Sequence, residues 1–131
     1  MFDLTGKNAL VTGASGGIGG AIAEALHAAG ASVTLSGTRE APLRELADTL
    51  GERAHVVTAN LGDAAEVEAL PKQAAEAMGS VDILVNNAGI TGGNAVTWEL
   101  DPAIWRQVME VNLTAPFVLC RALVPGMIAR G

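Results

Sequence analysis

Apolar residues along this chain follow two alternating patterns, short continuous runs and longer stretches of helical period. The short runs are rich in β-branched residues and predict strands at residues 8–11, 32–36, 55–59 and 81–86. Helical periodicity predicts helices that start near residues 18, 42, 63 and 101, and the last one reaches toward residue 130. In the first helix, Ile18, Ile22, Leu26 and Ala29 share one face, and Gly30 follows where a helix usually stops.

Polar and proline residues mark where these helices begin and bend. Asp63 opens a D-x-x-E start signal, and Asp101 with the proline after it is typical of an N-cap and first helical position. Pro71 lies inside the third helical pattern and should kink or break that helix near its middle. Pro116 and Pro125 predict bends in the last helix.

The regular alternation of strand and helix predicts an α/β fold, a three-layer parallel sheet with helices on both faces. A doubly wound arrangement gives the strand order 3-2-1-4, which leaves the fourth strand at an edge. An apolar edge strand invites pairing with another chain, and the last helix would lack a neighbour for its apolar side. We therefore expect a homodimer or higher oligomer that buries the fourth strand or the last helix.

Composition removes several classes of protein from consideration. The 131 residues carry 8 basic and 14 acidic side chains, a net charge of −6, without a Lys/Arg cluster, which argues against nucleic-acid and anionic-membrane partners. A single cysteine makes a disulfide scaffold or a cysteine-rich metal site unexpected. The first residues do not resemble a signal peptide, and Arg121 interrupts the longest apolar run, so we expect a cytoplasmic protein without a membrane span.

A glycine-rich turn follows the first strand and carries the clearest chemical signal. It reads Thr12-Gly13-Ala14-Ser15-Gly16-Gly17-Ile18-Gly19. Gly13 permits a tight turn, Gly17 lets the backbone approach a pyrophosphate, and Gly19 allows close packing of helix on strand. The N–H groups and dipole of the following helix then favour an anion. The alternative is a turn with a structural role only, but its strand–turn–helix setting favours a dinucleotide.

With these motifs the sequence resembles the short-chain dehydrogenase/reductase family. The T-G-x-x-x-G-x-G spacing fits the turn, Asn86-Asn87-Ala88-Gly89 matches the family's N-N-A-G motif, and Asn112 matches its catalytic asparagine. Within the family, the first 90 or so residues look most like bacterial 3-oxoacyl-acyl-carrier-protein reductases. The resemblance covers roughly the first half of a typical member, so residues 1–131 are expected to be the N-terminal half of a Rossmann-type domain, with no second domain.

The end of the second strand bears on the choice of cofactor. An NAD-selective site generally has an acidic residue there, which binds the ribose 2′-OH. This chain has Thr38 and Arg39 instead, which can donate to a 2′-phosphate and pair with it. We therefore expect NADP(H) in preference to NAD(H), although Arg39 could also be a solvated charge at a helix start. Many NADP-preferring relatives have a basic residue where this chain has Gly16.

The resemblance assigns further cofactor contacts. Asn60 and Leu61, after the third strand, would hold the adenine, and Asn87, Ala88 and Gly89 would pass close to the ribose. Plain turns are the alternative reading of both segments. The full set of expected cofactor-binding residues is Gly13, Ser15, Gly16, Gly17, Ile18, Gly19, Thr38, Arg39, Asn60, Leu61, Asn87, Ala88 and Gly89, with no metal site.

The catalytic half of the family pattern is missing. Family members reduce a carbonyl with a tyrosine as proton donor, a lysine four residues later and a serine, but this chain has no tyrosine. Its lysines, Lys7 and Lys72, lie far from that role, and Asn112 is the one catalytic position present, unless it only satisfies a helix bend. His27 and His55 are expected to be surface or structural residues. Cysteine and tryptophan side chains are expected in packing roles, namely Cys120, Trp98 and Trp105.

Three functions remain open at this point. The chain could hold NADP(H) without turnover, as a half-domain. It could instead act as a carbonyl reductase, on a substrate such as a 3-oxoacyl thioester, with the missing residues supplied by a partner chain. It could also be a truncated or engineered fragment without function.

Overall fold

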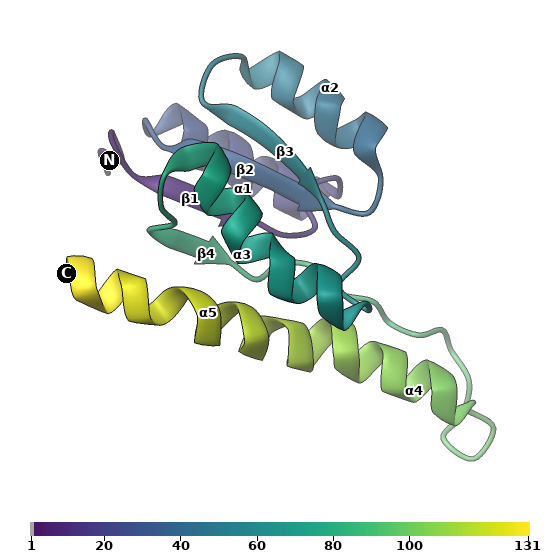
Figure 1. The fold of residues 1–131 in the computed structure, drawn as a ribbon. Coiled ribbons are helices and arrows are strands. Elements are labelled where there is room, and N and C mark those ends of the chain that lie inside the picture. The colour runs from purple at the N-terminus through teal and green to yellow at the C-terminus, as the bar shows by residue number, and fades with distance from the viewer. Residues whose placement is uncertain (1) are drawn as a thin grey trace.

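The computed structural model describes residues 2–131 as one parallel sheet between two layers of helices (Figure 1). The strands are β1 (Asn8–Val11), β2 (Ser32–Gly37), β3 (Ala54–Thr58) and β4 (Ile83–Val85). The helices are α1 (Gly17–Ala28), α2 (Glu40–Leu50), α3 (Ala64–Met78), α4 (Pro102–Met109), the π-helical η1 (Glu110–Thr114) and α5 (Ala115–Arg130). The sheet order is β3-β2-β1-β4, with every pair parallel, which confirms the predicted α/β fold and strand order.

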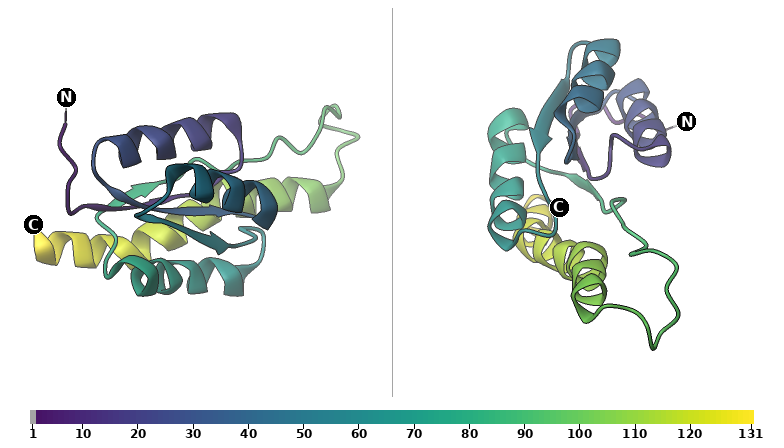
Figure 2. Two further views of the ribbon diagram at one scale, coloured as in Figure 1. Left: turned by 90° about the horizontal axis from the view of Figure 1, so that it is seen from above. Right: turned by 90° about the vertical axis from the view of Figure 1, so that its right-hand side faces the viewer.

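Alternating side chains of the central strand β1 supply two separate cores. Ala9 and Val11 are fully buried and pack with residues of α1 and α2 on one face of the sheet. Leu10, between them, points to the other face and packs with residues of α3 and α5. The two views in Figure 2 show these helix pairs on opposite sides of the sheet. Burial on both faces explains why the strand sequences are continuous apolar runs.

Helix α3 is not broken at Pro71, so of the two predicted effects, a kink or a break, the break does not occur. The helix runs from Ala64 to Met78 with Pro71 inside it, and the ring of Pro71 is buried. Its start is as predicted, since the Asp63 carboxylate accepts hydrogen bonds from the backbone N–H groups of Ala65 and Glu66. Burial of the proline ring and this N-cap offset the loss of one helical hydrogen bond.

The last 29 helical residues form one continuous rod with a π-helical turn in the middle. The Ala115 N–H donates to the Glu110 carbonyl, five residues earlier. Pro116, which has no N–H to continue the α-helical ladder, follows directly. Neither Pro116 nor Pro125 ends the helix. By length and hydropathy alone, the rod Pro102–Arg130 is long and apolar enough to cross a bilayer, contrary to the expectation of no membrane span. A helix that packs on a protein core can have the same length and hydropathy.

Strand β4 lies at the edge of the sheet and is shorter than predicted. It has three residues, all half-buried, and hydrogen bonds only to β1 within the described residues.

The C-terminal end of α5 is bound to the residues just before β4. Arg130 Nε lies 3.4 Å from Asp82 Oδ1, and Arg130 Nη2 donates to the Val81 carbonyl at 2.7 Å.

The predicted packing roles of the tryptophans are wrong within this chain. Trp98 is 84% exposed and Trp105 is 54% exposed. Trp98 lies in the segment between β4 and α4, which extends away from the body of the molecule in Figure 1. Cys120 is half-buried, not in the core, and its Sγ accepts a weak hydrogen bond from Asn86 Nδ2 at 3.6 Å.

Candidate functional site

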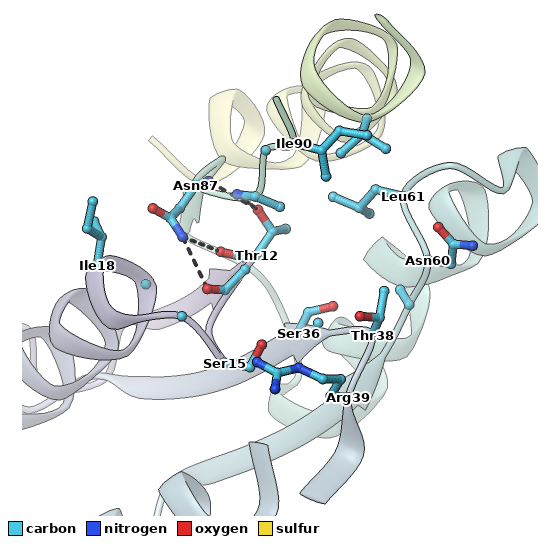
Figure 3. Close-up of a pocket in the computed structure, with 18 of the residues that line it drawn as sticks. Thr12, Ser15, Ile18, Ser36, Thr38, Arg39, Asn60, Leu61, Asn87 and Ile90 are labelled. Atoms are coloured by element: carbon cyan, nitrogen blue, oxygen red, sulfur yellow. Dashed lines mark hydrogen bonds between the residues drawn. The ribbon is translucent and has the colours of Figure 1, made fainter. Parts of the chain in front are cut away.

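One cavity of about 540 Å³ lies where the carboxyl ends of all four strands meet. Open α/β sheets bind ligands at this edge, and the volume is in the range of cofactor sites. Figure 3 shows side chains from four segments of the chain facing it. All thirteen residues predicted to bind a cofactor line this cavity: Gly13, Ser15, Gly16, Gly17, Ile18, Gly19, Thr38, Arg39, Asn60, Leu61, Asn87, Ala88 and Gly89.

The glycine turn after β1 has little room for side chains except on the side of the cavity. Gly13 has φ of +63°, and a Cβ there would lie 2.8 Å from Asn87 Nδ2. A Cβ at Gly19 would overlap the Gly13 carbonyl oxygen. A Cβ at Gly17, by contrast, would meet no atom within 4 Å. Gly17 is therefore the point where a ligand can come close to the backbone.

The N-terminus of α1 faces this opening without a side-chain cap. Gly16 is the N-cap, and the first turn of the helix has no acidic residue. Ile18, in this turn, lines the cavity and is 74% exposed, at the N-terminal end of the apolar helical face that the sequence predicts. Uncapped N–H groups at the positive end of a helix dipole bind anions such as phosphate.

A hydrogen-bond cluster joins the glycine turn to the loop after β4. Asn87 Nδ2 donates to the carbonyl oxygens of Thr12 and Gly13, at 3.1 and 3.2 Å. Thr12 Oγ1 accepts from the N–H groups of Asn87 and Ala88, each at 3.1 Å (Figure 3). It also donates to the Val85 carbonyl at 3.3 Å. Because Thr12 is buried, these bonds hold two walls of the cavity in a fixed relation.

The wall after β2 supplies the charge of the site. Arg39 is the one charged residue among those that line the cavity, and both Arg39 and Thr38 are exposed. No acidic side chain lines the cavity, and Arg39 has no ion-pair or hydrogen-bond partner within residues 2–131. This part of the cavity is therefore suited to a negatively charged group.

The wall after β3 is a short turn that leads into α3. Asn60 Oδ1 accepts from the Gly62 N–H at 2.9 Å, and the Asn60 N–H donates to Glu66 Oε1 at 3.3 Å. Asn60 therefore stabilises the turn, which is the alternative role given for it above, and it also lines the cavity. Leu61 is 8% exposed and offers an apolar surface beside it.

Asn112, in η1, is not among the residues that line the cavity. Its Oδ1 accepts from the Ile90 N–H at 2.9 Å, and its Nδ2 donates to the Ile90 carbonyl at 2.8 Å. The side chain therefore fixes the loop after β4 and does not cap a helix bend. No histidine, cysteine or lysine lines the cavity, and no cluster of potential metal ligands occurs within residues 2–131.

Sequence reasoning missed seven residues of the cavity lining. Four of them lie one or two positions before a predicted cofactor-binding residue, at the end of a strand: Thr12, Ser36, Gly37 and Ala59. Extending each predicted binding segment by two residues toward its strand would have included them. Ile90 directly follows the N-N-A-G motif. Gln107 and Val111 come from a later helix, and no local motif marks them.

Comparisons with known proteins agree with this geometry. The sequence profile of the short chain dehydrogenase family matches residues 7–131. The chain is 53% identical over 130 residues to Nodulation protein G of Rhizobium meliloti, with 99% of this chain and 53% of the relative covered. It is 42% identical over 129 residues to the 3-oxoacyl-[acyl-carrier-protein] reductase FabG of Vibrio cholerae, with 98% and 52% covered.

Solved structures give the same picture. A metagenomic short-chain oxidoreductase, crystallised in complex with NADP, superposes with a TM-score of 0.92 at 37% identity, over 98% of this chain and 59% of the other. A protein described as a betaketoacyl-ACP reductase gives a TM-score of 0.89 at 39% identity, over 97% and 51%. The chain spans about half the length of the curated relatives that it matches.

Proposed function

Because this chain belongs to the short chain dehydrogenase family, we propose that it binds NADP(H) at the cavity on the carboxyl edge of its sheet, without turnover of its own. The observation that carries the proposal is the combination of an open glycine turn and a single cation. Gly17 and the uncapped start of α1 suit the pyrophosphate, and Arg39 suits a second anionic group. The family's expected reaction is the reduction of a carbonyl.

The residues of the cavity fit the parts of such a cofactor. The N–H groups at the start of α1 would donate to the pyrophosphate, and the Gly13–Asn87 contact would keep this turn rigid. The apolar Leu61 and the turn at Asn60 would hold the adenine. When bound, the cofactor supplies a hydride that adds to a carbonyl carbon. What this chain itself contributes is binding and orientation.

The preference for NADP(H) over NAD(H) rests on the wall after β2. Arg39 can pair with a 2′-phosphate, and the Thr38 hydroxyl can donate to it, because both side chains are exposed at the cavity. An NAD-selective site would instead have an acidic residue for the ribose 2′-OH, and none lines this cavity. NADP in the crystal structure of a relative supports the same choice.

Turnover needs a proton donor beside the substrate oxygen, and these 131 residues offer none. They contain no tyrosine, and neither Lys7 nor Lys72 lines the cavity. A positioned general acid contributes about 10²–10⁴ in rate. Asn112, the family's catalytic asparagine, would act here through its two hydrogen bonds to the Ile90 backbone.

A second candidate function is reduction of a carbonyl substrate such as a 3-oxoacyl thioester, with the proton donor supplied by another chain. FabG relatives named as 3-oxoacyl reductases favour that substrate class.

We also propose that a second copy of the chain covers the outer side of α5. Large apolar side chains are exposed in a row along η1 and α5, namely Leu113 at 60%, Phe117 at 63%, Val124 at 40% and Ile128 at 75%. Their spacings of four, seven and four residues place them on one face of the helix. Strand β4 is the weaker candidate, because a three-residue edge strand offers few backbone partners.

A fluorescence titration of the purified chain with NADPH, and with NADH in parallel, tests the proposed function. Saturable binding with NADPH clearly tighter is the expected result. Absence of binding to either dinucleotide would contradict the proposal and would leave the glycine turn with a structural role only. A parallel assay with a generic ketone should give no turnover, and measurable turnover would favour the reductase.

A further inference from the structure

The far end of the cavity, between β3 and the α4–η1 helix, is an apolar slot bordered by two side-chain amides, those of Asn60 and Gln107. Leu61 and Val111 are each 8% exposed, and Ile90 is partly exposed beside them. A Cβ at Gly62 would lie 3.7 Å from Val111 Cγ2, so the turn after β3 lies against this helix. Such a slot suits a flat aromatic ring, which buries its faces and leaves its polar edge to be matched.

Gln107 is the amide on the helical side of this slot. It lies on α4 four residues before Val111, so the two share a face of the helix, and both line the cavity. Within residues 2–131 the Gln107 amide makes no hydrogen bond to the protein. Its donor and its acceptor are both available to a ligand.

The other amides that border the cavity are partly engaged. Asn60 Oδ1 accepts from Gly62, and Asn87 Nδ2 uses both of its N–H groups on the carbonyls of Thr12 and Gly13. Asn60 keeps its Nδ2 donors and one lone pair of Oδ1. Gln107 is the cavity amide that has neither its oxygen nor its nitrogen engaged.

We propose that Gln107 reads the edge of the cofactor's adenine. This inference rests on the proposed function, because it assumes that the apolar slot holds the base. A side-chain amide matches adenine with two hydrogen bonds, since its oxygen accepts from the 6-amino group and its NH₂ donates to the adjacent ring nitrogen. Gln107 would then determine specificity for the base, while Arg39 determines specificity for the 2′-phosphate.

Deletion of the 6-amino group from the ligand, combined with a change of Gln107, tests the pairing. The probes are adenosine 2′,5′-bisphosphate and its analogue with purine in place of adenine, measured by titration calorimetry. The unsubstituted chain should bind the adenine compound about tenfold more tightly. Gln107→Leu should bind both compounds with equal affinity. Gln73→Leu, an exposed glutamine on α3 outside the cavity, should keep the tenfold preference.

Gln107→Glu is a second test variant, because glutamate has nearly the same size and shape as glutamine. It keeps an acceptor for the 6-amino group and loses the donor, so its preference for adenine should be intermediate. The inference is wrong if Gln107→Leu retains the tenfold preference, or if it weakens both ligands by the same factor. If the unsubstituted chain binds neither these probes nor NADPH, the proposed function itself fails. If it binds NADPH and the base preference does not respond to Gln107, only the inference fails.

Discussion

The side-chain amide of Asn112 pairs with both backbone groups of Ile90, at 2.9 Å and 2.8 Å, across 22 positions of sequence. This contact ties the π-helical turn η1 to the loop that closes one side of the cavity. Thr12 and Asn87 tie the other end of the same loop to the glycine turn. The loop after β4 is therefore held at both ends before any ligand arrives.

We predict that Asn112→Ala weakens NADPH binding several-fold and lowers stability by about 1 kcal/mol, because two exposed hydrogen bonds are lost. Thermal unfolding and the fluorescence titration measure the two effects. Asn94→Ala, in the exposed part of the same segment, is the control and should leave both unchanged. If Asn112→Ala binds NADPH as tightly as the unsubstituted chain, the loop does not depend on this contact.

Two alanine substitutions in the glycine turn should have different effects, one on NADPH affinity and the other on the free energy of unfolding. Gly17→Ala adds a methyl group into open space, so the melting temperature should stay the same or rise slightly, while NADPH binding should fall because the backbone can no longer approach the pyrophosphate. Gly19→Ala should lower stability by about 1–3 kcal/mol, since its Cβ would overlap the Gly13 carbonyl oxygen. Equal NADPH affinity in Gly17→Ala would show that the pyrophosphate lies elsewhere.

Arg39→Ala should weaken NADPH binding about tenfold or more and leave NADH binding nearly unchanged. The reason is that Arg39 is the one charged residue that lines the cavity, and we expect it to pair with the phosphate that NADH lacks. Arg44→Ala is a matched control on α2, the helix that Arg39 precedes, where Arg44 pairs with Glu40 at 3.3 Å on the surface. A parallel loss for both dinucleotides in Arg39→Ala would count against a 2′-phosphate contact.

Phe117→Glu should convert the oligomer into a monomer at tens of micromolar protein, because it places a charge in the centre of the exposed apolar row on α5. Light scattering gives the mass directly. Gln73→Glu adds the same charge on the outer side of α3 and should not change the mass. A monomeric unsubstituted chain would remove the proposed self-association.

The sequence predicted those parts of the molecule that local patterns determine. The four strands follow from apolar runs, their order from the doubly wound arrangement, and the glycine turn from the spacing of Gly13, Gly17 and Gly19. The predicted break at Pro71 does not occur, because burial inside α3 overrides the low helix propensity of proline.

Features that depend on which surfaces meet were harder to predict. Trp105 was expected to pack and is exposed, since only the folded arrangement shows which face of the last helix meets the sheet. Gln107 reaches the cavity from a helix that begins 13 residues after Gly89, and nothing in its immediate sequence indicates this. Contacts across such separations come from topology, not from local pattern.

The edge position of β4 has a consequence for motion. Within the described residues this strand hydrogen bonds to β1 alone, whereas β1 and β2 have partners on both sides. Amides of β4 and of the loop after it should therefore exchange with deuterium faster than those of β1 and β2, because an edge opens at a lower free energy than the centre. Local opening of this wall of the cavity would break the contacts of the loop with Thr12 and Asn112 while the glycine turn stays folded, and it would provide a route by which a ligand enters and leaves.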